Sequence, residues 1–527
     1  MTLRLASPAI LIASLLLLPF LNKPFTIDDP IFLREARHAL VDPLHPADFE
    51  QVWNAGDRLK VSQYLLGGTL PAYVLAPVAA LGGREWMAHL YQWLLLCGML
   101  CFSVSVARRW GCDRRQAGTV GLLIASNPVT LAMAATCMPD VMALMFGMAG
   151  MDRVLLFRQE RRWGAGVAAG LLLAAAVLCR ASTAPMLLVA ALLLMPETWK
   201  RAARALWPVA VAVAIAGVAV GLNRGPAENA TLGGAIQSLT SLRNVPRNLV
   251  AFLCFQALTG PVLVYALLAG GRRFAALVGA VVAVGLTLSL VTQSANLVLY
   301  AIPAALGICF VAACVAVTNP LKQAPTDHKQ RWSVLLWLAS GLVALPYVFM
   351  GAKYLLPGVP AAALLIVLHA ARVPHPRYPL TVAILIALGW VSGALIVEGD
   401  TTLAASQRRA VERMIVPRLH DGSKVWAGGQ WAFLAYAEDA GAKALANTPP
   451  LPAPGDFIVV SRLDYYGRLL RLPIRLELLN TQTDRRCGVF VLNRRLGAGF
   501  YSNRFGYLPF AIGCGEVNAY DLYRVLP

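Results

Sequence analysis

The chain carries its most unusual acidic residues at the ends of apolar segments. Asp28 and Asp29 are adjacent and follow the first apolar segment, and Asp140 follows another. Ionisable residues beside membrane-spanning segments often mark a reaction centre or a transport path. A carboxylate at a membrane edge can have its pKa raised enough to serve as a general base. We therefore take Asp28, Asp29 and Asp140 as candidate catalytic residues.

Each acid also has a structural interpretation. One Asp of the pair can cap the helix expected to begin near Pro30, and Asp140 can cap the segment that follows it. The loop that holds Asp140 is only a few residues long, which keeps this acid close to the membrane surface. That position suits a group that must meet a membrane-held substrate.

Two cations lie between apolar segments in the same way. Lys353 precedes Tyr354 in FMGAKYLLPGVP, and Arg180 lies in VLCRASTAP. A cation at such a position can hold a lipid phosphate through charge-assisted hydrogen bonds. The alternative is that the lysine only extends its side chain to the membrane interface. We predict phosphate binding by Lys353, Tyr354 and Arg180.

A metal site and a nucleotide site are less well supported. The first polar loop contains scattered donors, but no HxH or HExxH spacing, so a divalent metal remains a weak alternative. These donors are His38, Asp42, His45, Asp48, Glu50 and Asp57. The chain has no GxxxxGK[ST] motif and no DxD triplet, and we therefore expect no water-soluble nucleotide donor.

The elements that must position these residues are membrane helices. Of the 527 residues, 58% are hydrophobic and only 14% are charged, which indicates a polytopic membrane protein. Apolar windows predict about 13 transmembrane helices. They cover 5–22, 86–106, 117–136, 141–157, 164–179, 182–196, 206–222, 248–270, 274–291, 295–317, 333–350, 354–371 and 379–398.

The basic residues predict how the chain is threaded. The net charge of +19 comes mainly from Lys and Arg in short clusters between apolar segments, which fits cytoplasmic loops better than nucleic-acid binding. These basic clusters all lie on one side of the membrane if the segment 63–82 lies along the membrane interface and does not cross the bilayer. The amino terminus is then cytoplasmic, and Asp28, Asp29, Asp140 and Lys353 share the outer face. We expect a multi-pass protein of the inner (plasma) membrane.

The chain divides into two predicted domains. Residues 1–398 form an all-α bundle with a first outer loop at 23–85, and residues 399–527 form a small α/β domain outside the cytoplasm. The runs GDFIVVSR and RCGVFVLNRR are strand-like, AVERMIVPRL is typical of an amphipathic helix, and NTPPLPAPGD is a Pro-rich connector. Cys487 and Cys514 are the cysteines of this domain, either as a disulfide or as two thiols.

Three motifs carry a resemblance to a known family. TIDDPIFLREA, CMPDVMAL and KYLLPGVPAAALL, together with GGREWMAHLYQW in the second helix, resemble the polyprenyl-phosphate-sugar-dependent glycosyltransferases of C-type fold. That group includes the protein O-mannosyltransferases and the lipid A aminoarabinose transferase. The similarity covers roughly residues 5–370. It implies a bundle of about 13 helices, juxtamembrane helices in the first outer loop and a periplasmic C-terminal domain.

The resemblance also implies an activity and residue roles. A sugar would move from a polyprenyl-phosphate donor to a lipid, glycan or protein acceptor, with inversion at the anomeric carbon. Asp28 or Asp29 would be the base, Asp140 the second acid, and Lys353 would approach the donor phosphate. Many members have Asp-Glu where this chain has Asp-Asp, and Arg where it has Lys353, which loses bidentate phosphate binding.

Two other classes of function remain open at this point. A transporter or flippase for a lipid-linked sugar could use the same three aspartates as proton or substrate sites. Transporters usually place such charges near the middle of the membrane, whereas these lie at helix ends. A non-catalytic assembly protein would bind a partner through its C-terminal domain.

Overall fold

The computed structural model describes most of the chain. The described residues are 2–53, 57–64, 68–196, 202–222, 240–269, 274, 276, 278–284, 287, 301–319, 325–373, 376–463 and 473–527. Among them are five helices long and apolar enough to cross a membrane, or seven spans if each of two bent helix pairs counts as one. The protein is a multi-pass, mostly helical membrane protein with a β-sheet region near its C-terminus. The predicted number of about 13 spans is not shown by these residues.

The helical part follows the predicted windows closely in several places. Helix α5 (Glu85–Arg109) and helix α8 (Asp140–Glu160) pack side by side. A buried ion pair joins them, since Nε of Arg109 lies 2.7 Å from the carboxylate of Asp152. The other helices of this part are α1 (Thr2–Leu17), α6 (Arg114–Ala125), α7 (Pro128–Ala134), α9 (Trp163–Cys179), α10 (Pro185–Leu194), α11 (Ala202–Leu222), α13 (Val245–Thr259), α14 (Pro261–Ala269), α16 (Ile302–Thr318), α17 (Pro325–Leu338) and α18 (Val359–Arg372).

Two predicted helices are bent pairs. The window 117–136 contains α6 and α7, which meet at 62°, and the window 248–270 contains α13 and α14, which meet at 57°. Both second helices begin at a proline, Pro128 and Pro261. Proline lacks the N–H that would continue the preceding helix and is favoured at a new first turn, which explains the breaks. In the window 274–291 the described residues are 274, 276, 278–284 and 287, and all of them are helical.

The first polar loop folds as a small layer of its own. Helix α2 (Asp29–Ala39) packs on helix α4 (Leu70–Ala80), and strands β1 (Glu50–Trp53) and β2 (Asp57–Lys60) form a hairpin between them, followed by α3 (Val61–Tyr64). Helix α4 has 11 residues. At about 1.5 Å per residue this is about half of what a bilayer core requires. The apolar segment 63–82 thus contains no helix of spanning length in its described part.

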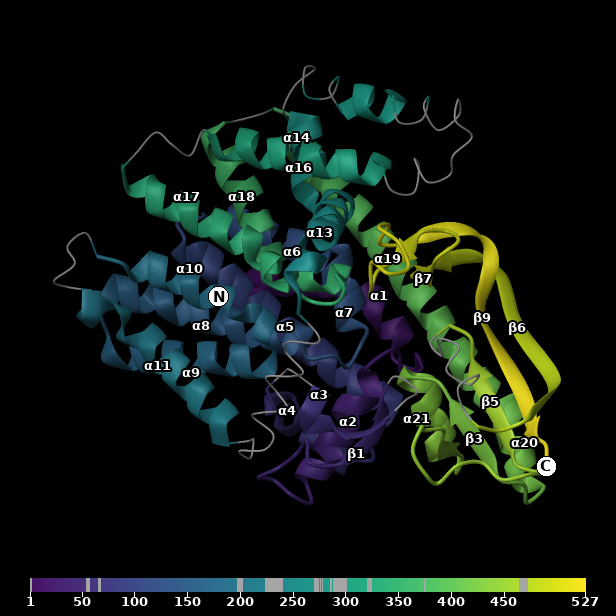
Figure 1. Cartoon of the computed structure of the whole chain (residues 1–527). Helices are drawn as coiled ribbons and strands as arrows, with labels where there is room; N and C mark the ends of the chain where they lie inside the picture. The colour runs from purple at the N-terminus through teal and green to yellow at the C-terminus, as the bar shows by residue number, and fades with distance from the viewer. Residues whose placement is uncertain are drawn as a thin grey trace.

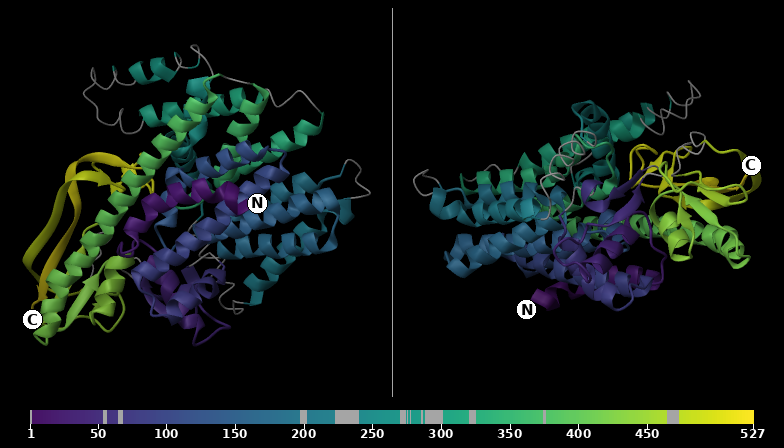
Figure 2. Two further views of the ribbon diagram at one scale, coloured as in Figure 1. Left: turned by 180° about the vertical axis from the view of Figure 1, so that it is seen from behind. Right: turned by 60° about the horizontal axis from the view of Figure 1, so that its bottom comes forward.

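Helix α19 (Tyr378–Ala410) connects the helical part to the C-terminal region. It continues without a break through residue 398, where the sequence predicts a domain boundary, and a π-helical turn, η9 (Val411–Ile415), and helix α20 (Val416–His420) extend it. Figure 1 shows α19 running past the helices toward the sheet, and the view from behind in Figure 2 shows it along one side of the molecule, next to the long strands.

The C-terminal region is a mixed sheet with helices packed against it. Its strands lie in the order β4–β3–β5–β9–β6, with β3 parallel to β4 and β5, and β9 antiparallel to β5 and β6. Helix α21 (Trp431–Asp439) shares a buried core with η9 and the sheet. The strands are β3 (Val425–Gly428), β4 (Lys443–Ala444), β5 (Phe457–Ser461), β6 (Leu476–Phe490), β7 (Leu492–Asn493), β8 (Ala498–Gly499) and β9 (Ala511–Val525).

A disulfide fastens the two longest strands together. Cys487 of β6 and Cys514 of β9 are opposite each other in the register and are bonded. Of the two alternatives from the sequence, the structure has the disulfide. The predicted strands at 455–462 and 486–495, and the helix near 410–419, are also present.

The C-terminal region is bonded directly to the first polar loop and to the helices. The backbone N–H of Phe25 donates to the hydroxyl of Tyr436 at 2.7 Å, and that hydroxyl donates to Glu85 at 3.1 Å. Arg34 of α2 forms an ion pair with Glu438 of α21 at 2.5 Å. These contacts bring the C-terminal region against the part of the chain that carries Asp28.

Candidate functional site

Asp28 and Lys353 meet at the junction of these parts. Asp28 is the N-terminal cap position of α2, where its side chain makes no capping hydrogen bond. Lys353 is in the short 3-10 helix η8 (Ala352–Gly358), directly before α18. One carboxylate oxygen of Asp28 lies 3.5 Å from Nζ of Lys353. The side chain of Asp28 is 23% exposed and that of Lys353 is 5% exposed, so the acid is the more accessible member of the pair.

A second acid and cation lie beside them. Asp140 is the first residue of α8, and Arg180 follows the end of α9. Nε of Arg180 lies 2.9 Å from one carboxylate oxygen of Asp140, and both side chains are largely buried. The other oxygen, Oδ2, has no hydrogen-bond partner among the described residues. A buried polar atom without a partner is uncommon and calls for a functional or solvent explanation.

Tyr354 connects the two pairs. Its ring centroid is 5.5 Å from Cζ of Arg180 and 5.9 Å from Nζ of Lys353. Cations at such distances are attracted to the face of an aromatic ring. The structure therefore gathers five of the six residues that the sequence singles out into one cluster of two acids, two cations and a tyrosine. They come from the first loop, α8, the end of α9 and η8.

Asp29 lies next to this cluster but has a different environment. Its side chain is fully buried. Its two carboxylate oxygens accept hydrogen bonds from the backbone N–H groups of Thr26, at 3.0 Å, and Cys137, at 2.7 Å. Burial raises the pKa of Asp29 to about 7, although Lys23 and the two hydrogen bonds act in the opposite direction. Its contacts hold the start of α2 against the segment that leads to Asp140.

Sequence reasoning missed a third acid and cation close by. Nζ of Lys23 lies 2.7 Å from Asp400 of α19 and also donates to the carbonyl of Ala135 at 2.8 Å. The hydroxyl of Thr26 donates to the same Asp400 at 3.0 Å. The sequence does contain a sign of this pair, because Lys23 follows the first apolar window and Asp400 follows the last.

The C-terminal region contributes Tyr501. Its ring centroid is 5.9 Å from Nζ of Lys353, and burial raises the pKa of its hydroxyl well above the usual value. The neighbouring backbone is bonded to the start of η8, since the N–H of Ala352 donates to the carbonyl of Phe500 at 2.7 Å. A Cβ on Gly351 would lie 2.6 Å from the carbonyl oxygen of Tyr501, so only glycine allows this approach. No sequence pattern points to Tyr501.

The open side of Asp28 has a strained backbone. Asp28 lines a small cavity with Ile27, Gln430 and Trp431. Ile27 has φ of 44° and Trp431 has φ of 58°. A β-branched or bulky residue rarely adopts these values, and such strain concentrates at binding and catalytic sites. The first loop and α21 therefore meet at Asp28 through two residues whose backbone conformation must be held by the surrounding structure.

One group of side chains could hold a metal ion. Ligand atoms of Asp29, His89 and Cys137 lie within 4.8 Å of one another, and all three residues are buried. His89 uses Nδ1 toward the carbonyl of Leu21 at 3.0 Å, and its Nε2 has no partner in the described part of the chain. Asp, His and Cys are ligands that zinc accepts. The first-loop donors that the sequence suggested lie elsewhere; Asp42, for example, pairs with His45 at the surface.

Comparisons with known proteins give likeness in structure only. No family model matches the chain, and no curated protein sequence matches it. Among solved structures, apo ArnT from Cupriavidus metallidurans is 15% identical with a TM-score of 0.45, covering 89% of this chain and 95% of that chain. The apo Archaeoglobus fulgidus oligosaccharyltransferase is 13% identical with a TM-score of 0.44, covering 85% and 64%. The arabinofuranosyltransferase AftD from Mycobacteria is 13% identical with a TM-score of 0.40, covering 99% and 41%.

These structures belong to the C-type-fold glycosyltransferases that the sequence motifs resemble. Identities of at most 15% and TM-scores below 0.5 transfer no residue role to this chain. The function is therefore argued from the side chains of the site.

Proposed function

We propose that the protein is a membrane glycosyltransferase that moves a sugar from a polyprenyl-phosphate donor to an acceptor at the outer face of the membrane. One observation carries the proposal: a partly exposed acid, Asp28, stands 3.5 Å from a buried cation, Lys353, and the ring of Tyr354 lies near both Lys353 and a second cation, Arg180. An acid that can accept a proton and cations that can hold a phosphate are what this transfer requires.

The cations serve the leaving group. When the bond between the anomeric carbon and the phosphate oxygen breaks, the lipid phosphate keeps the electron pair and gains negative charge. Lys353 and Arg180 stabilise this charge from fixed positions in a site that is mostly buried, where electrostatic stabilisation is strongest. Asp140 holds Arg180 in place through their 2.9 Å ion pair.

The partly exposed acid, Asp28, serves the acceptor. A hydroxyl or amine of the acceptor attacks the anomeric carbon from the face opposite the phosphate, and its proton passes to the carboxylate of Asp28. Attack from the opposite face inverts the configuration of that carbon. Asp28 is the better candidate for this step because Asp29 is fully buried and both of its oxygens are occupied by backbone N–H groups. Asp29 is then a positioning residue.

The position of the charges favours transfer over transport. Asp28 is at the N-cap position of α2, Asp140 begins α8, and Lys353 precedes α18, so all three lie at helix ends. A transporter site is expected near the middle of broken helices in the bilayer. Placement of the site on the outer face, with the C-terminal region outside the cytoplasm, rests on the distribution of basic loops.

The proposal is tested with purified protein in liposomes. The donor is an undecaprenyl-phosphate sugar with a labelled sugar, because an ArnT structure contains undecaprenyl phosphate, and total membrane lipid and glycan serve as the acceptor pool. The wild-type protein should transfer label to an acceptor, and Lys353→Met should not. The matched control Lys424→Met changes an exposed lysine of the C-terminal region and should transfer normally. Equal transfer by the wild type and Lys353→Met contradicts the proposal.

A further inference from the structure

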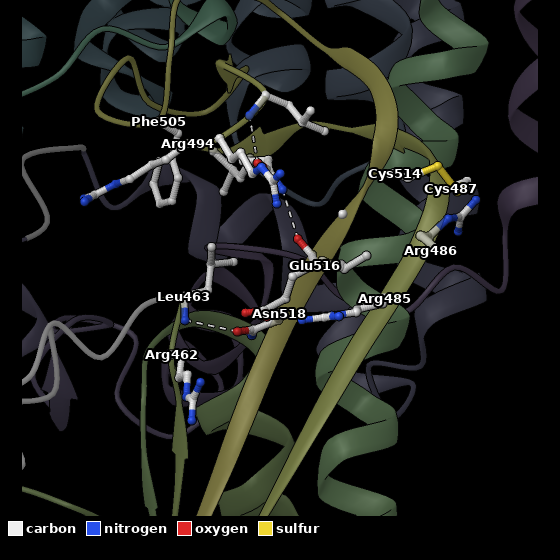
Figure 3. Close-up of a pocket in the computed structure, with 16 residues that line it drawn as sticks. Arg462, Leu463, Arg485, Arg486, Cys487, Arg494, Phe505, Cys514, Glu516 and Asn518 are labelled. Atoms are coloured by element: carbon white, nitrogen blue, oxygen red, sulfur yellow. Dashed lines mark hydrogen bonds between the residues drawn. A yellow bond between two sulfur atoms is a disulfide. The ribbon is translucent and has the colours of Figure 1, made fainter.

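A second polar pocket lies in the C-terminal region, apart from the Asp28–Lys353 pair. It has a volume of about 800 Å³ and lies between strands β6 and β9, the end of β5 and the segment 492–505. This volume is typical of sites for small molecules, which span about 300–1,000 Å³. Figure 3 shows its labelled side chains, with Arg485 coming from β6, Arg494 from the segment after β7, and Arg462 from the end of β5.

The lining of this pocket is strongly basic. Its charged residues are Arg462, Arg485, Arg486, Arg494, Arg495 and one acid, Glu516. Positive charge collected in a concave surface attracts anions and raises their local concentration. Arginine is also the side chain best suited to phosphate and carboxylate groups, because its planar guanidinium donates two parallel hydrogen bonds.

Two of the arginines already have a structural role. Arg462 makes a two-pronged contact with Asp521, at 2.7 Å for each hydrogen bond. Arg486 turns to helix α19, where it donates to the hydroxyl of Thr402 and lies 3.2 Å from Glu398. Their charges are largely balanced within the protein.

The other arginines are differently placed. Arg485 and Arg495 are exposed, and neither has an ion-pair partner among the residues that the structure describes. Glu516 is opposite Arg485 in the register of β6 and β9, but no ion pair forms between them. The guanidinium of Arg494 lies over the ring of Phe505, with its Cζ 5.5 Å from the centroid. Exposed arginines therefore line this pocket together with an aromatic ring.

The backbone that holds this pocket is rigid. The disulfide Cys487–Cys514 joins its two long strands at the pocket itself. Asn493 donates to the carbonyl of Glu516 at 2.9 Å and accepts from the N–H of Leu496 at 3.0 Å, which fixes the segment that carries Arg494 and Arg495. A backbone that is already held in this way loses little ordering entropy when a ligand binds, which favours a binding site here.

We propose that this pocket binds the phosphate group of a polar ligand, with Arg485 and Arg495 as the anchoring side chains. The ligand is a water-soluble sugar phosphate or the headgroup of an anionic phospholipid, which present the same chemistry. The binding site does not depend on the proposed sugar transfer. It is nevertheless connected to the Asp28–Lys353 site, because the segment that carries Arg495 also carries Tyr501, which lies against Lys353.

The test uses the full-length protein in neutral detergent, with glucose 1-phosphate as the probe and glucose as its uncharged counterpart. Titration calorimetry should give a dissociation constant for glucose 1-phosphate at least about tenfold below that for glucose. The double variant Arg485→Gln/Arg495→Gln should lose this preference. The matched control Arg475→Gln/Arg524→Gln changes two exposed arginines at the opposite end of the β6–β9 ribbon and should keep it.

Further experiments distinguish a lipid headgroup from a soluble ligand, and this pocket from the proposed sugar-transfer site. In nanodiscs, phosphatidylglycerol should compete with glucose 1-phosphate if the ligand is a lipid headgroup, and phosphatidylcholine should not; a soluble ligand gives the same affinity in both. The variant Asp28→Asn should bind glucose 1-phosphate normally even if sugar transfer fails. Equal affinity for glucose and glucose 1-phosphate overturns the inference, and so does an equal loss in the control double variant.

Discussion

The carboxylate of Asp28 lies 3.5 Å from the ammonium group of Lys353, although one residue follows the first apolar segment and the other precedes one of the last. The two are brought together because α2 and η8 are each held by a hydrogen bond to the backbone of another segment. Asp29 binds the backbone at Cys137, and the start of η8 binds the backbone at Phe500. The pair therefore depends on the first loop, the helices and the C-terminal region together.

The two adjacent aspartates should differ in what their loss does. Asp28→Asn removes the partly exposed carboxylate that accepts the proton and should lower kcat by about 10²–10⁴-fold with little change in thermal stability. Asp29→Asn keeps one amide oxygen for the two backbone donors, so it should lower the unfolding temperature and retain part of the activity. Transfer rates and melting curves of both variants measure this.

Asp42→Asn is the control for these variants, since Asp42 is a surface residue of the same loop, and its partners in the described part of the chain are His45 and the neighbouring backbone. Full activity in Asp28→Asn, with activity lost in Asp29→Asn at unchanged stability, would reverse the assignment of the two acids.

Removing one member of the Asp140–Arg180 pair should lower the stability of the protein more than removing both. Asp140→Asn leaves a buried guanidinium without its counter-charge, which costs about 3–5 kcal/mol of stability. Arg180→Gln in the same protein should restore much of that stability but not the transfer activity. Chemical denaturation in detergent measures the coupling between the two changes.

The control for this cycle is the exposed pair of Lys60 and Asp48, for which Lys60→Gln should cost at most about 1 kcal/mol. If Asp140→Asn is no more destabilising than Lys60→Gln, the buried pair does not have the role described.

The close approach of Gly351 to Tyr501 predicts a steric effect on activity. In Gly351→Ala the new methyl group would lie 2.6 Å from the carbonyl oxygen of Tyr501, so the C-terminal segment must move away from Lys353. We expect a lower transfer rate and faster proteolysis of the segment around residue 500. Gly164→Ala, whose added methyl meets nothing within 4 Å, should behave as the wild type. Normal activity in Gly351→Ala would mean that this contact is not needed.

Glu35 should make the protein less stable as the pH rises. It is buried in α2, and burial raises its pKa from 4.5 to about 8. The folded protein therefore binds a proton that the unfolded chain releases above pH 4.5, so its stability falls between pH 4.5 and pH 8 and is constant above that range. Glu35→Gln cannot ionise, so it should have a higher melting temperature than the wild type at about pH 8.5 to 9 but not at about pH 4. These pH values lie about half a unit or more outside the titration range.

Melting curves across this pH range give the comparison, and Glu50→Gln, which changes an exposed acid of the same loop, is the control. A wild-type curve parallel to that of Glu35→Gln would show that Glu35 is already ionised in the folded protein.

Much of the helical part could be predicted from hydropathy, because a membrane helix must be apolar along its whole length. The bends at Pro128 and Pro261 were not predicted, although both prolines are visible in the sequence, because an apolar window averages over the break. The sequence predicts a domain boundary at residue 398 because the apolar pattern ends there, and α19 runs through this position to Ala410, which lies in the core under the sheet.

The site could be predicted only where charge interrupts an apolar pattern. Asp28, Asp140, Arg180 and Lys353 are such interruptions, and the structure places them together. The position of Tyr501 depends on how the C-terminal region packs on η8, and a single tyrosine in a polar tail gives no sign of that. The different environments of Asp28 and Asp29 likewise follow from the backbone at Cys137, which no local pattern contains.

The central claim is that Lys353 and Arg180 hold a lipid phosphate. The most direct measurement is the affinity of the purified protein for undecaprenyl phosphate compared with undecaprenol, which lacks the charged group. The wild type should bind the phosphate form at least about tenfold more tightly, and Lys353→Met/Arg180→Gln should bind the two lipids equally. Equal affinity of the wild-type protein for both lipids would contradict the account.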